Sequence, residues 1–575
     1  FFIGIAAIIG SEDEIVVEPN SVLELDLTTT VKDYAPKENN PIAEALELID
    51  NNLALNNIIN AIENAKTDTN IKGISIKTDA VNAGVSQTQA IRNKIEDFKE
   101  SGKFVYAYND VYSQKNYYLS SVADSVFLNP VGAIDFKGLA TEILYYKDFE
   151  DKYGIQMEVI RHGKYKSAVE PYLTNKMSEA NREQTTSFLK SIWSEITEDI
   201  SKSRNLSIEK VNLIADNSLG RNPILAKSNN LIDGIIYEDE YKEKIALNSD
   251  KKTNTISLQD YINSGKGRIS STAKDKIAVI YAQGEIMYAK GNENIIGQGI
   301  TNKAIRKARE DKNVKAIVLR VNSPGGSALS SDVLWEATEE YKATGRPFVV
   351  SMGGVAASGG DYVSAGADRI FAEAGTITGS IGVVGMKFVL GDAMEKMGVT
   401  THGTKRGKHA DLMNTSRTYT AEEAKLVRSS MLDVYGTFKK RIMDGRGKKI
   451  KGDLEKLAGG RVYSGKDALT VGLVDELGGL NEAIIHAGKL AKLKSYDTYL
   501  FPEPTGGIEG MLSKGSKGDD YEFIKMNATN KPSSVLRAEI LNNSALRLLG
   551  PQKQQQINRF INQVEAFQHQ RVLMI

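Results

Sequence analysis

The chain has 575 residues, with 73 Lys and Arg against 73 Asp and Glu, so its formal net charge is zero. This balance gives no overall basic field, and we expect no nucleic acid among its partners. The absence of cysteine excludes disulfides, thiolate zinc sites and cysteine nucleophiles. The five histidines form neither an H-x-x-x-H nor an H-E-x-x-H pattern, so we expect neither a metal site nor another cofactor.

The chain begins with the apolar run FFIGIAAIIG and continues with the acidic run SEDE. Ten apolar residues are too few to cross a bilayer, which takes about twenty. The run is therefore either a short buried segment or the outer end of a membrane anchor. An acidic flank is typical of the non-cytoplasmic side of a membrane, so we expect residues 1–18 to be the end of an N-terminal anchor. No other apolar run in the sequence reaches spanning length.

The chain contains an internal repeat with a nearly constant offset. VADSVFLNP (122–130) resembles GADRIFAEA (366–374), and the offset is 244 residues. YGIQMEVIRHGK (153–164) resembles MGVTTHGTKRGK (397–408) with the same offset. One unit of roughly 240 residues has therefore been used twice.

Each unit alternates short β-branched runs with helical patterns. We place an N-terminal repeat over residues 19–265 and a C-terminal repeat over 266–500. In the second repeat, KIAVIYAQGEI, VKAIVLRV and RPFVVSMG are typical of buried parallel strands. Helices are predicted over 327–345 and 420–445, and the second of these has its counterpart over 178–200. The alternation predicts the α/β class, with two tandem repeats of mostly parallel sheets and packed helices.

The composition changes in the last part of the chain, residues 501–575. TGGIEGMLSKGSKGDD (505–520) is rich in Gly and Ser, which is typical of a linker. QKQQQINRFINQVEAFQHQRVLMI (552–575) has the pattern of an amphipathic helix that ends in an apolar tip. We interpret this tail as a packing element toward a neighbouring subunit rather than as part of a catalytic site.

The two repeats differ at two motifs of small residues. Ser358 lies in AASGGDY, which follows a predicted strand but does not match the G-x-S-x-G elbow of serine hydrolases. The equivalent position of the first repeat is Gln114. NSPGGS (322–327) follows another predicted strand, and its counterpart DAVNAG (79–84) lacks the paired glycines.

These small residues have a chemical interpretation and a structural one. Gly325 and Gly326 allow a tight turn that presents backbone N–H groups, and Gly359 offers a second donor beside Ser358. Two such donors suit an oxyanion, whereas the structural interpretation is that the glycines only form turns. Because both motifs are missing from the first repeat, we favour the oxyanion interpretation.

A base for Ser358 is not obvious from the histidines, because nothing in the sequence places His402 or His409 beside it. The N-terminal repeat contains the unusual stretch RHGKYKSAVEPY, in which Lys166 has Ala410 as its counterpart. A free lysine has a pKa near about 10.4, so only about one molecule in 2,500 is neutral at pH 7. Burial lowers a lysine pKa, and Tyr165, Ala168 and Val169 are candidate walls of such a pocket. The alternative is a solvated surface lysine.

Four motifs together, NSPGGS, AASGGDYVSAGAD, TGSIGV (378–383) and GKYKSAVEPY (163–172), resemble those of the signal peptide peptidase A family in its long duplicated bacterial form. The resemblance covers about residues 20–500. It implies a crotonase/ClpP-like α/β fold and a serine protease with a Ser/Lys dyad. It also implies a single-pass anchor, a catalytic body on the periplasmic (outer) face of the bacterial cytoplasmic membrane, and a homotetramer.

Carried over residue by residue, the resemblance assigns Ser358 as the nucleophile and Lys166 as the general base. Gly326 and Gly359 become the oxyanion-hole donors, and Ser380 becomes a hydroxyl partner of the lysine. Asp361, an acid close to the nucleophile, departs from the family pattern.

The expected activity is endopeptidase cleavage of apolar peptides such as released signal peptides. Two alternatives stay open at this point. One is an acyl-CoA enzyme of the crotonase type, which shares the fold and the backbone oxyanion hole but does not need Ser358 or Lys166. The other is a non-catalytic membrane scaffold or chaperone. The sequence also leaves open whether Ser358 and Lys166 of one site come from one chain or from two.

Overall fold

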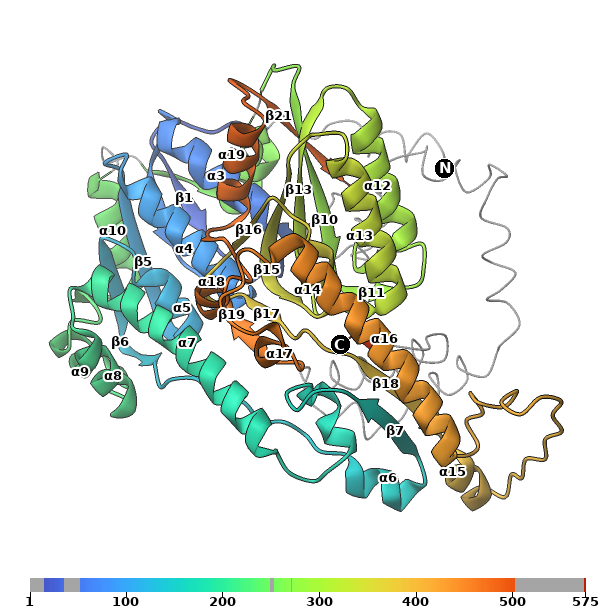
Figure 1. The fold of residues 1–575 in the computed structure, drawn as a ribbon. Coiled ribbons are helices and arrows are strands. Elements are labelled where there is room, and N and C mark those ends of the chain that lie inside the picture. The colour runs from blue at the N-terminus through green and yellow to red at the C-terminus, as the bar shows by residue number, and fades with distance from the viewer. Residues whose placement is uncertain (1–14, 36–51, 249–252, 270, 502–572, 575) are drawn as a thin grey trace, which may run out of the picture.

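A computed structural model of the chain describes residues 15–35, 52–248, 253–269, 271–501 and 573–574 (Figure 1). Most of the predicted anchor end, the predicted linker and nearly all of the predicted amphipathic helix lie outside these residues. Within the described residues, no helix combines the length and the apolar character needed to span a bilayer.

The N-terminal repeat is built on a six-stranded sheet in which all neighbouring strands run parallel. Its strands are short and rich in β-branched residues, as expected for strands that are covered on both faces. From edge to edge they are β8 (Gly234–Ile235), β6 (Ser125–Asp135), β5 (Phe104–Ser113), β4 (Ile71–Ile76), β1 (Ser21–Leu25) and β9 (Asn254–Ser257).

The C-terminal repeat has an equivalent sheet that is parallel except at one edge, where β19 pairs antiparallel with β17. The predicted strands of this repeat therefore lie side by side in one sheet. The order is β19 (Val462–Ser464), β17 (Ile377–Gly379), β15 (Phe348–Ala357), β13 (Val314–Ser323), β10 (Lys276–Gln283) and β21 (Asp497–Phe501), with β16 (Arg369–Ala372) and β20 (Glu476–Leu477) branching from β15.

The helices repeat with the strands, and the longer counterparts have equal lengths. They are α3 (Leu55–Thr67) and α12 (Gln298–Glu310), α4 (Val85–Lys99) and α13 (Ala328–Lys342), α7 (Glu179–Arg204) and α16 (Ala421–Arg446), and α10 (Glu238–Asn248) and α19 (Leu480–Leu490). The three predicted helices correspond to α13, α16 and α7. Each begins after a Ser or Thr whose side chain accepts a backbone N–H. The parallel sheets and packed helices confirm the predicted α/β class.

Shorter elements complete the two repeats. They are β2 (Val31–Lys32) and β3 (Leu53–Ala54), the helices α5 (Gln114–Ser120), α6 (Lys147–Tyr153), α8 (Ile208–Asp216), α9 (Pro223–Ser228), α11 (Leu258–Tyr261), α14 (Gly359–Ser364), α15 (Gly391–Lys396), α17 (Leu454–Leu457) and α18 (Gly465–Val471), and the turns Ser167–Tyr172 and Ile262–Lys266.

A third sheet joins the two repeats. Its order is β12 (Ile295–Gly297), β11 (Glu285–Met287), β14 (Gly326–Ser327), β22 (Leu573–Met574), β18 (Val384–Val389) and β7 (Gln156–Arg161). β18 of the second repeat pairs antiparallel with β7 of the first, from Val384↔Arg161 to Val389↔Gln156. The pairing brings the segment that follows β7, which contains Lys166, beside the segment that precedes β18, which contains Ser380.

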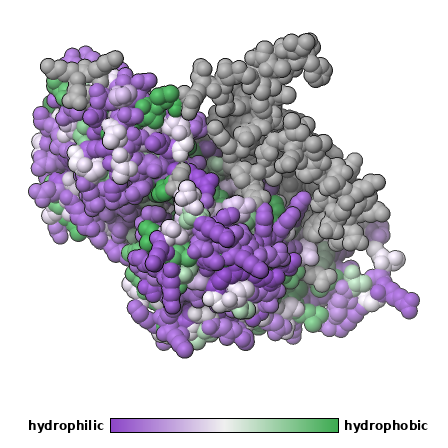
Figure 2. Space-filling model, turned by 90° about the horizontal axis from the view of Figure 1, so that it is seen from above, coloured by the Kyte–Doolittle hydropathy of each residue, from purple (hydrophilic) through white to green (hydrophobic). Residues whose placement is uncertain are grey.

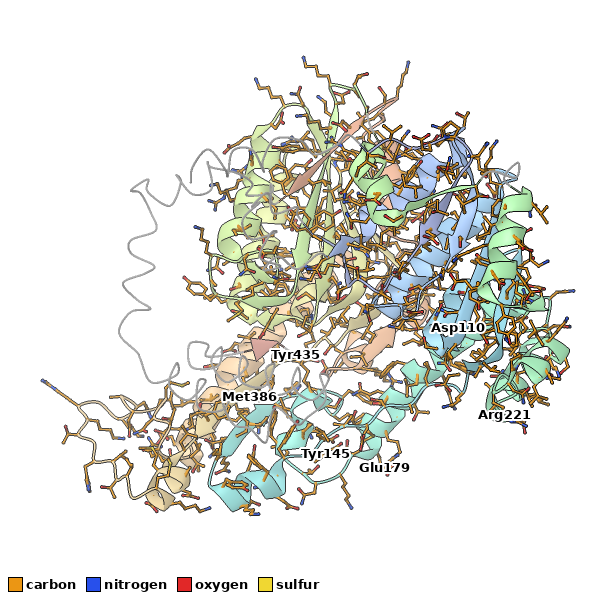
Figure 3. All side chains as sticks on the ribbon, turned by 180° about the vertical axis from the view of Figure 1, so that it is seen from behind. Asp110, Tyr145, Glu179, Arg221, Met386 and Tyr435 are labelled. Atoms are coloured by element: carbon orange, nitrogen blue, oxygen red, sulfur yellow. The ribbon has the colours of Figure 1, made fainter. Side chains whose placement is uncertain are left out.

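Apolar side chains pack mainly inside each repeat, around one large cluster per repeat. A smaller cluster of Met157, Val169, Val384 and Met386 fills the junction between β7 and β18. Seen from behind, Met386 and Tyr435 lie near the part of the N-terminal repeat that carries Tyr145 and Glu179 (Figure 3). Seen from above, hydrophilic side chains cover most of the described surface (Figure 2).

One buried ion pair also connects the repeats. Asp33, which follows β2, accepts a hydrogen bond from the guanidinium of Arg320 on β13 at 3.0 Å, and their side chains are 1% and 2% exposed. Arg320 further donates to the Ser351 hydroxyl and to the carbonyl of Met352. A buried charge that loses its partner is strongly destabilising, because the remaining charge is left without water or counter-charge.

We therefore expect Asp33→Ala to lower the free energy of unfolding by about 3–5 kcal/mol. The midpoint of denaturant unfolding measures this change. Arg268→Ala is the matched control, because it removes an ion pair with Asp497 in which Arg268 is 62% exposed, and such pairs contribute less than about 1 kcal/mol. Equal shifts in the two variants would contradict a stabilising role for the buried pair.

Candidate active site

Ser358 occupies a strained turn between a strand and a helix. β15 ends at Ala357 and α14 begins at Gly359, and Ser358 between them has φ 56° and ψ −113°. This conformation is unfavourable for a residue with a side chain, and the surrounding bonds hold it: the Ser358 N–H donates to the carbonyl of Gly379 at 2.8 Å. A strained serine at a strand-to-helix turn is the geometry of a nucleophile elbow. The local sequence therefore builds the elbow without its usual motif.

Lys166 reaches Ser358 from the other repeat. Its side chain is 1% exposed, and its Nζ lies 2.9 Å from the Oγ of Ser358. Nζ also lies 2.9 Å from the carbonyl oxygen and 3.0 Å from the Oγ of Ser380. Both Ser358 and Lys166 belong to the same chain, so a single chain suffices to bring the two side chains into contact.

Burial changes the charge state of this lysine. It lowers the pKa of Lys166 to about 7. The printed contacts of Nζ are two hydroxyl oxygens and one carbonyl oxygen, none of which carries the negative charge that would hold the proton. A substantial fraction of the molecules therefore carries a neutral amine at pH 7, hydrogen-bonded to the Ser358 hydroxyl.

The room for Lys166 is made by glycines that the sequence reasoning did not identify. A Cβ on Gly460 would lie 2.6 Å from the backbone nitrogen of Lys166, and Gly460 has φ +84°. A Cβ on Gly163 would lie 2.4 Å from the carbonyl oxygen of Gly459. The backbone of residues 163–166 thus crosses the backbone of residues 459–460 in direct contact. Val169 is buried as predicted, whereas Ala168 is exposed and does not line the pocket.

A polar cluster on the same loop fixes the segment next to Lys166. The Tyr165 hydroxyl donates to the carboxylate of Glu183 at 2.9 Å, and the guanidinium of Arg461 donates to both, at 3.1 Å and 3.0 Å. The carbonyl of Arg461 accepts from the N–H of Ser380 at 2.7 Å. Arg461 is therefore hydrogen-bonded to Tyr165, which precedes Lys166 in the chain, and to Ser380, whose oxygen atoms contact the lysine amine.

The predicted oxyanion glycines lie beside Ser358. A Cβ on Gly359 would lie 3.2 Å from the Cα of Gly325, so the NSPGGS turn is in contact with the start of α14. Gly326 has φ +145°, and a Cβ there would lie 2.1 Å from the carbonyl oxygen of Ile286 on β11. No other residue type fits this position. The N–H of Gly359 belongs to the first turn of α14, where backbone donors have no partner within the helix.

Asp361 is a second buried titratable group near the nucleophile. Its side chain is 3% exposed, and burial raises the pKa of its carboxyl to about 7. One carboxyl oxygen lies 3.5 Å from the Oγ1 of Thr378, and the other is buried without a hydrogen-bond partner. The printed contacts of Lys166 do not include Asp361.

The equivalent positions of the N-terminal repeat are filled by structural residues. Gln114, at the position of Ser358, bonds to backbone groups of Lys137 and Gly138. Phe136, at the position of Ser380, is buried against Tyr117 and Trp193. Ala410, at the position of Lys166, is exposed. The described part of each chain therefore carries one complete constellation, built from both repeats.

Neither His402 nor His409 is among the printed contacts of Ser358 and Lys166. His402 and His409 lie on the segment 397–417, most of which is exposed. Among the described residues, no group of three or more His, Asp or Glu side chains is arranged to hold a metal ion.

Comparison with known proteins also points to a serine-based active site. A family model described as Peptidase family S49 matches residues 97–254 and 340–494, one stretch in each repeat. The chain is 32% identical over 511 residues to Protease 4 of Haemophilus influenzae, which covers 84% of this chain and 82% of that protein. It is 35% identical over 466 residues to Protease 4 of Salmonella typhi, with 79% and 74% covered. It is 34% identical over 440 residues to the chloroplastic serine protease SPPA of Arabidopsis thaliana, with 75% and 64% covered.

These similarities confirm the resemblance drawn from the four motifs, and they favour a peptidase over the acyl-CoA enzyme and the scaffold. With a matched stretch in each repeat and relatives that align over most of their length, the chain belongs to Peptidase family S49 and is a serine protease.

Proposed function

We propose that this protease is an endopeptidase in which Ser358 and Lys166 form a catalytic dyad. The observation that carries the proposal is the 2.9 Å contact between a hydroxyl on a strained elbow and the amine of a fully buried lysine. A base works best when its pKa lies near the working pH, and burial brings the pKa of Lys166 to about 7.

In the proposed mechanism, neutral Lys166 accepts the proton of Ser358 while Oγ attacks the carbonyl carbon of the peptide bond. The N–H groups of Gly326 and Gly359 donate to the oxygen that becomes negative in the tetrahedral intermediate. The Lys166 ammonium then gives its proton to the leaving amine, and the acyl group stays on Ser358. Water deprotonated by Lys166 hydrolyses this ester and restores the enzyme. Ser380 holds Nζ toward Ser358 through its hydroxyl and its carbonyl oxygen.

The proposed substrates are extended apolar peptides such as released signal peptides, and the proposed location is the periplasmic face of the bacterial cytoplasmic membrane. Both follow from the family resemblance. The apolar run at 1–10 and the acidic run that follows it support an anchor in which residues 1–18 form the outer end.

The proposed assembly is a ring of copies of this chain, with four copies as the family resemblance implies. The duplication supports a head-to-tail contact. β18 pairs with β7 within the chain, and their counterparts at an offset of 244 are residues 140–145 and 400–405. Both counterparts are largely exposed, and neither forms a strand in the described structure. If 400–405 of one copy pairs with 140–145 of the next, the same pairing recurs between chains and closes a ring.

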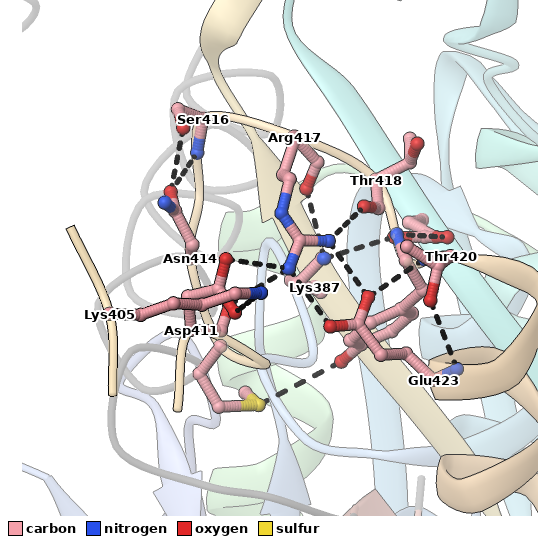
Figure 4. A network of polar contacts seen from close by, with 12 residues as sticks. Lys387, Lys405, Asp411, Asn414, Ser416, Arg417, Thr418, Thr420 and Glu423 are labelled. Carbon is pink, nitrogen blue, oxygen red and sulfur yellow. Dashed lines mark hydrogen bonds and ion pairs between the residues drawn. The ribbon is translucent and has the colours of Figure 1, made fainter. Parts of the chain in front are cut away.

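The structure holds the projecting segment 397–417 at its base. Arg417 donates to both carboxylate oxygens of Glu423 and pairs with Asp411, which also pairs with Lys405 (Figure 4). The Lys387 ammonium, on β18, donates to the carbonyl of Arg417. This network fixes the direction in which segment 397–417 leaves the body of the repeat. A segment that contacts a neighbouring copy needs such a fixed direction.

Ser358→Ala and Lys166→Met are each expected to reduce cleavage of an apolar model peptide by at least about 1,000-fold, because each removes one half of the dyad. Labelling by an active-serine phosphonate is expected to be lost in Ser358→Ala. Lys164→Met is the matched control: this neighbouring lysine is exposed, with its Nζ 4.7 Å from the ring centroid of Tyr165, and it is expected to retain activity. Full activity in Ser358→Ala or Lys166→Met would remove that residue from the mechanism.

The pKa of Lys166 and the pKa of Asp361 both lie at about 7, so the pH dependence of the wild type alone does not separate the two groups and a variant is needed. Only neutral Lys166 acts as a base, so kcat/KM is expected to rise about tenfold per pH unit below 7 and to level off above it. Asp361→Asn removes the other titrating group and is expected to keep this rise. If the rise disappears in Asp361→Asn, the carboxyl rather than the amine is the base.

The assembly is tested by sedimentation or light scattering. We expect a particle of four times the 63.0 kDa chain mass, and we expect deletion of residues 400–405 to release single chains. A deletion variant that keeps the full particle mass would contradict the proposed contact. The intramolecular pairing of β7 with β18 is unchanged in this variant, so its thermal stability serves as the folding control.

A further inference from the structure

A cavity at the junction of the two repeats lies apart from the candidate active site. Its volume is about 960 Å³, and neither Ser358 nor Lys166 lines it. Its walls are the helices α3 and α4 of the N-terminal repeat and α19 of the C-terminal repeat, which lie near one another in Figure 1. Its lining also includes the buried side chains of Asp33, Arg320 and Glu373.

Glu373 is the unusual group of this cavity. It follows β16 and is 5% exposed, and among the described residues no group is hydrogen-bonded to its carboxyl. Such a group is rare in folded proteins, because burial removes water from the carboxyl and supplies no partner in its place. The carboxyl of Glu482 approaches the same place: a Cβ on Gly479 would lie 2.7 Å from Oε1 of Glu373 and 3.3 Å from Oε2 of Glu482.

The cavity has an excess of negative charge that its own bases do not balance. Six of its lining side chains are acidic and three are basic, and each base already forms an ion pair with a lining acid. Within the described part of the chain, neither Glu373 nor Glu482 forms an ion pair. The paired side chains are Arg320 with Asp33, Lys66 with Asp97, and Lys94 with Asp97 and Glu63.

The two acids without an ion pair select a cation, and the rest of the lining selects an organic one. A metal ion needs several oxygen or nitrogen ligands at once, and no group of three or more His, Asp or Glu side chains in the described ranges is arranged to hold one. An ammonium group needs only hydrogen-bond acceptors for its N–H bonds. Leu55, Ile59 and Ile484 line the same cavity and offer contact to aliphatic carbons.

We propose that this cavity binds an aliphatic ammonium ion, with the ammonium group at the carboxyls of Glu373 and Glu482 and the carbon chain against the apolar wall. A free alkylamine and a lysine side chain share this chemistry. The proposed site goes beyond peptide cleavage and uses no group of the dyad. Because both repeats supply its walls, a bound ligand stabilises their junction and raises the melting temperature.

The site is tested by calorimetric titration of the full chain with butane-1,4-diamine. Glu373→Gln keeps the shape of the side chain and removes its charge, so the affinity is expected to fall at least about tenfold. Glu476→Gln on β20 is the matched control, because this acid is 47% exposed and pairs with Arg369, and it is expected to bind as the wild type does. No binding by the wild type at millimolar diamine, or equal affinity in Glu373→Gln, would overturn the site.

A second variant keeps the test decisive if Glu373→Gln does not fold, which its melting curve without ligand shows. Glu482 accepts the N–H of Gly479 through its side chain, and glutamine preserves this bond at the start of a helix. Glu482→Gln is therefore expected to fold and to bind the diamine more weakly than the wild type. Wild-type affinity in this variant would overturn the placement of the ammonium group.

The class of ligand is tested with matched probes. Butylamine is expected to bind, and butan-1-ol, which has the same carbon chain without the charge, is not. Binding of Nα-acetyl-lysine amide would identify a lysine side chain as an occupant, and binding of the free amines alone would identify a free amine; both results support an ammonium site. Equal binding of butan-1-ol, or displacement of the diamine by an equal concentration of Mg²⁺ or Ca²⁺, would overturn the class.

The binding is expected to depend on the ionisation of Glu373. Burial raises the pKa of its carboxyl to about 8; Glu482 on α19 and Glu195 and Asp199 on α7 raise it, and Arg320 on β13 lowers it. A cation requires the ionised carboxylate, so the affinity is expected to rise about tenfold per pH unit below 8 and to level off above it. Glu373→Gln is expected to lose this rise. A flat wild-type profile below pH 8 would overturn the role of Glu373.

The proposed site and the proposed dyad fail separately. Ser358→Ala is expected to bind butane-1,4-diamine with wild-type affinity, because Ser358 does not line the cavity. Loss of diamine binding in Ser358→Ala would overturn the separation of the two sites. Full peptidase activity in the same variant would overturn the dyad and leave the diamine result standing.

Discussion

The burial of one lysine amine between two repeats is the constraint on which the rest of the structure depends. An ammonium group in water is strongly solvated, and lowering its pKa from 10.5 to about 7 corresponds to a destabilisation of its charged form by about 5 kcal/mol. The amine is tolerated because three oxygen atoms contact it and because the folding of two large cores stabilises the surrounding backbone. A looser crossing of the repeats would admit water and return the lysine to its ordinary charge.

That crossing explains why the described part of this duplicated chain has one complete constellation rather than two. The elbow, the glycine turn and Ser380 come from the second repeat, and the lysine comes from the first through the β7–β18 pairing. The equivalent positions of the first repeat lack these groups, and Phe136 fills one of them as part of its core. The duplication thus supplied a second body against which the lysine is buried, and not a second site.

The sequence predicted much of this because repeats make differences visible. The offset of 244 places Gln114 opposite Ser358, and the structure puts both residues directly after equivalent strands, β5 and β15. The asymmetry of Lys166 pointed to the lysine whose amine the structure places against Ser358. Gly460 and Arg461 could not be predicted, because each acts through a contact with a distant part of the chain that leaves no local periodicity. Ala168 was expected to line the lysine pocket and is exposed, whereas Gly460, almost three hundred positions away, lies directly against the backbone of Lys166.

The third sheet shows how strand pairing positions residues of the two repeats against each other. A strand edge is a row of unpaired donors and acceptors, and it attracts any extended segment within reach. In this chain β18 has one edge against β7, which leads to Lys166, and the strand follows Ser380 by only a few residues. A change in the register of β18 against β7 would move Lys166 relative to Ser380 and Ser358, so the contacts of the lysine amine depend on this one pairing.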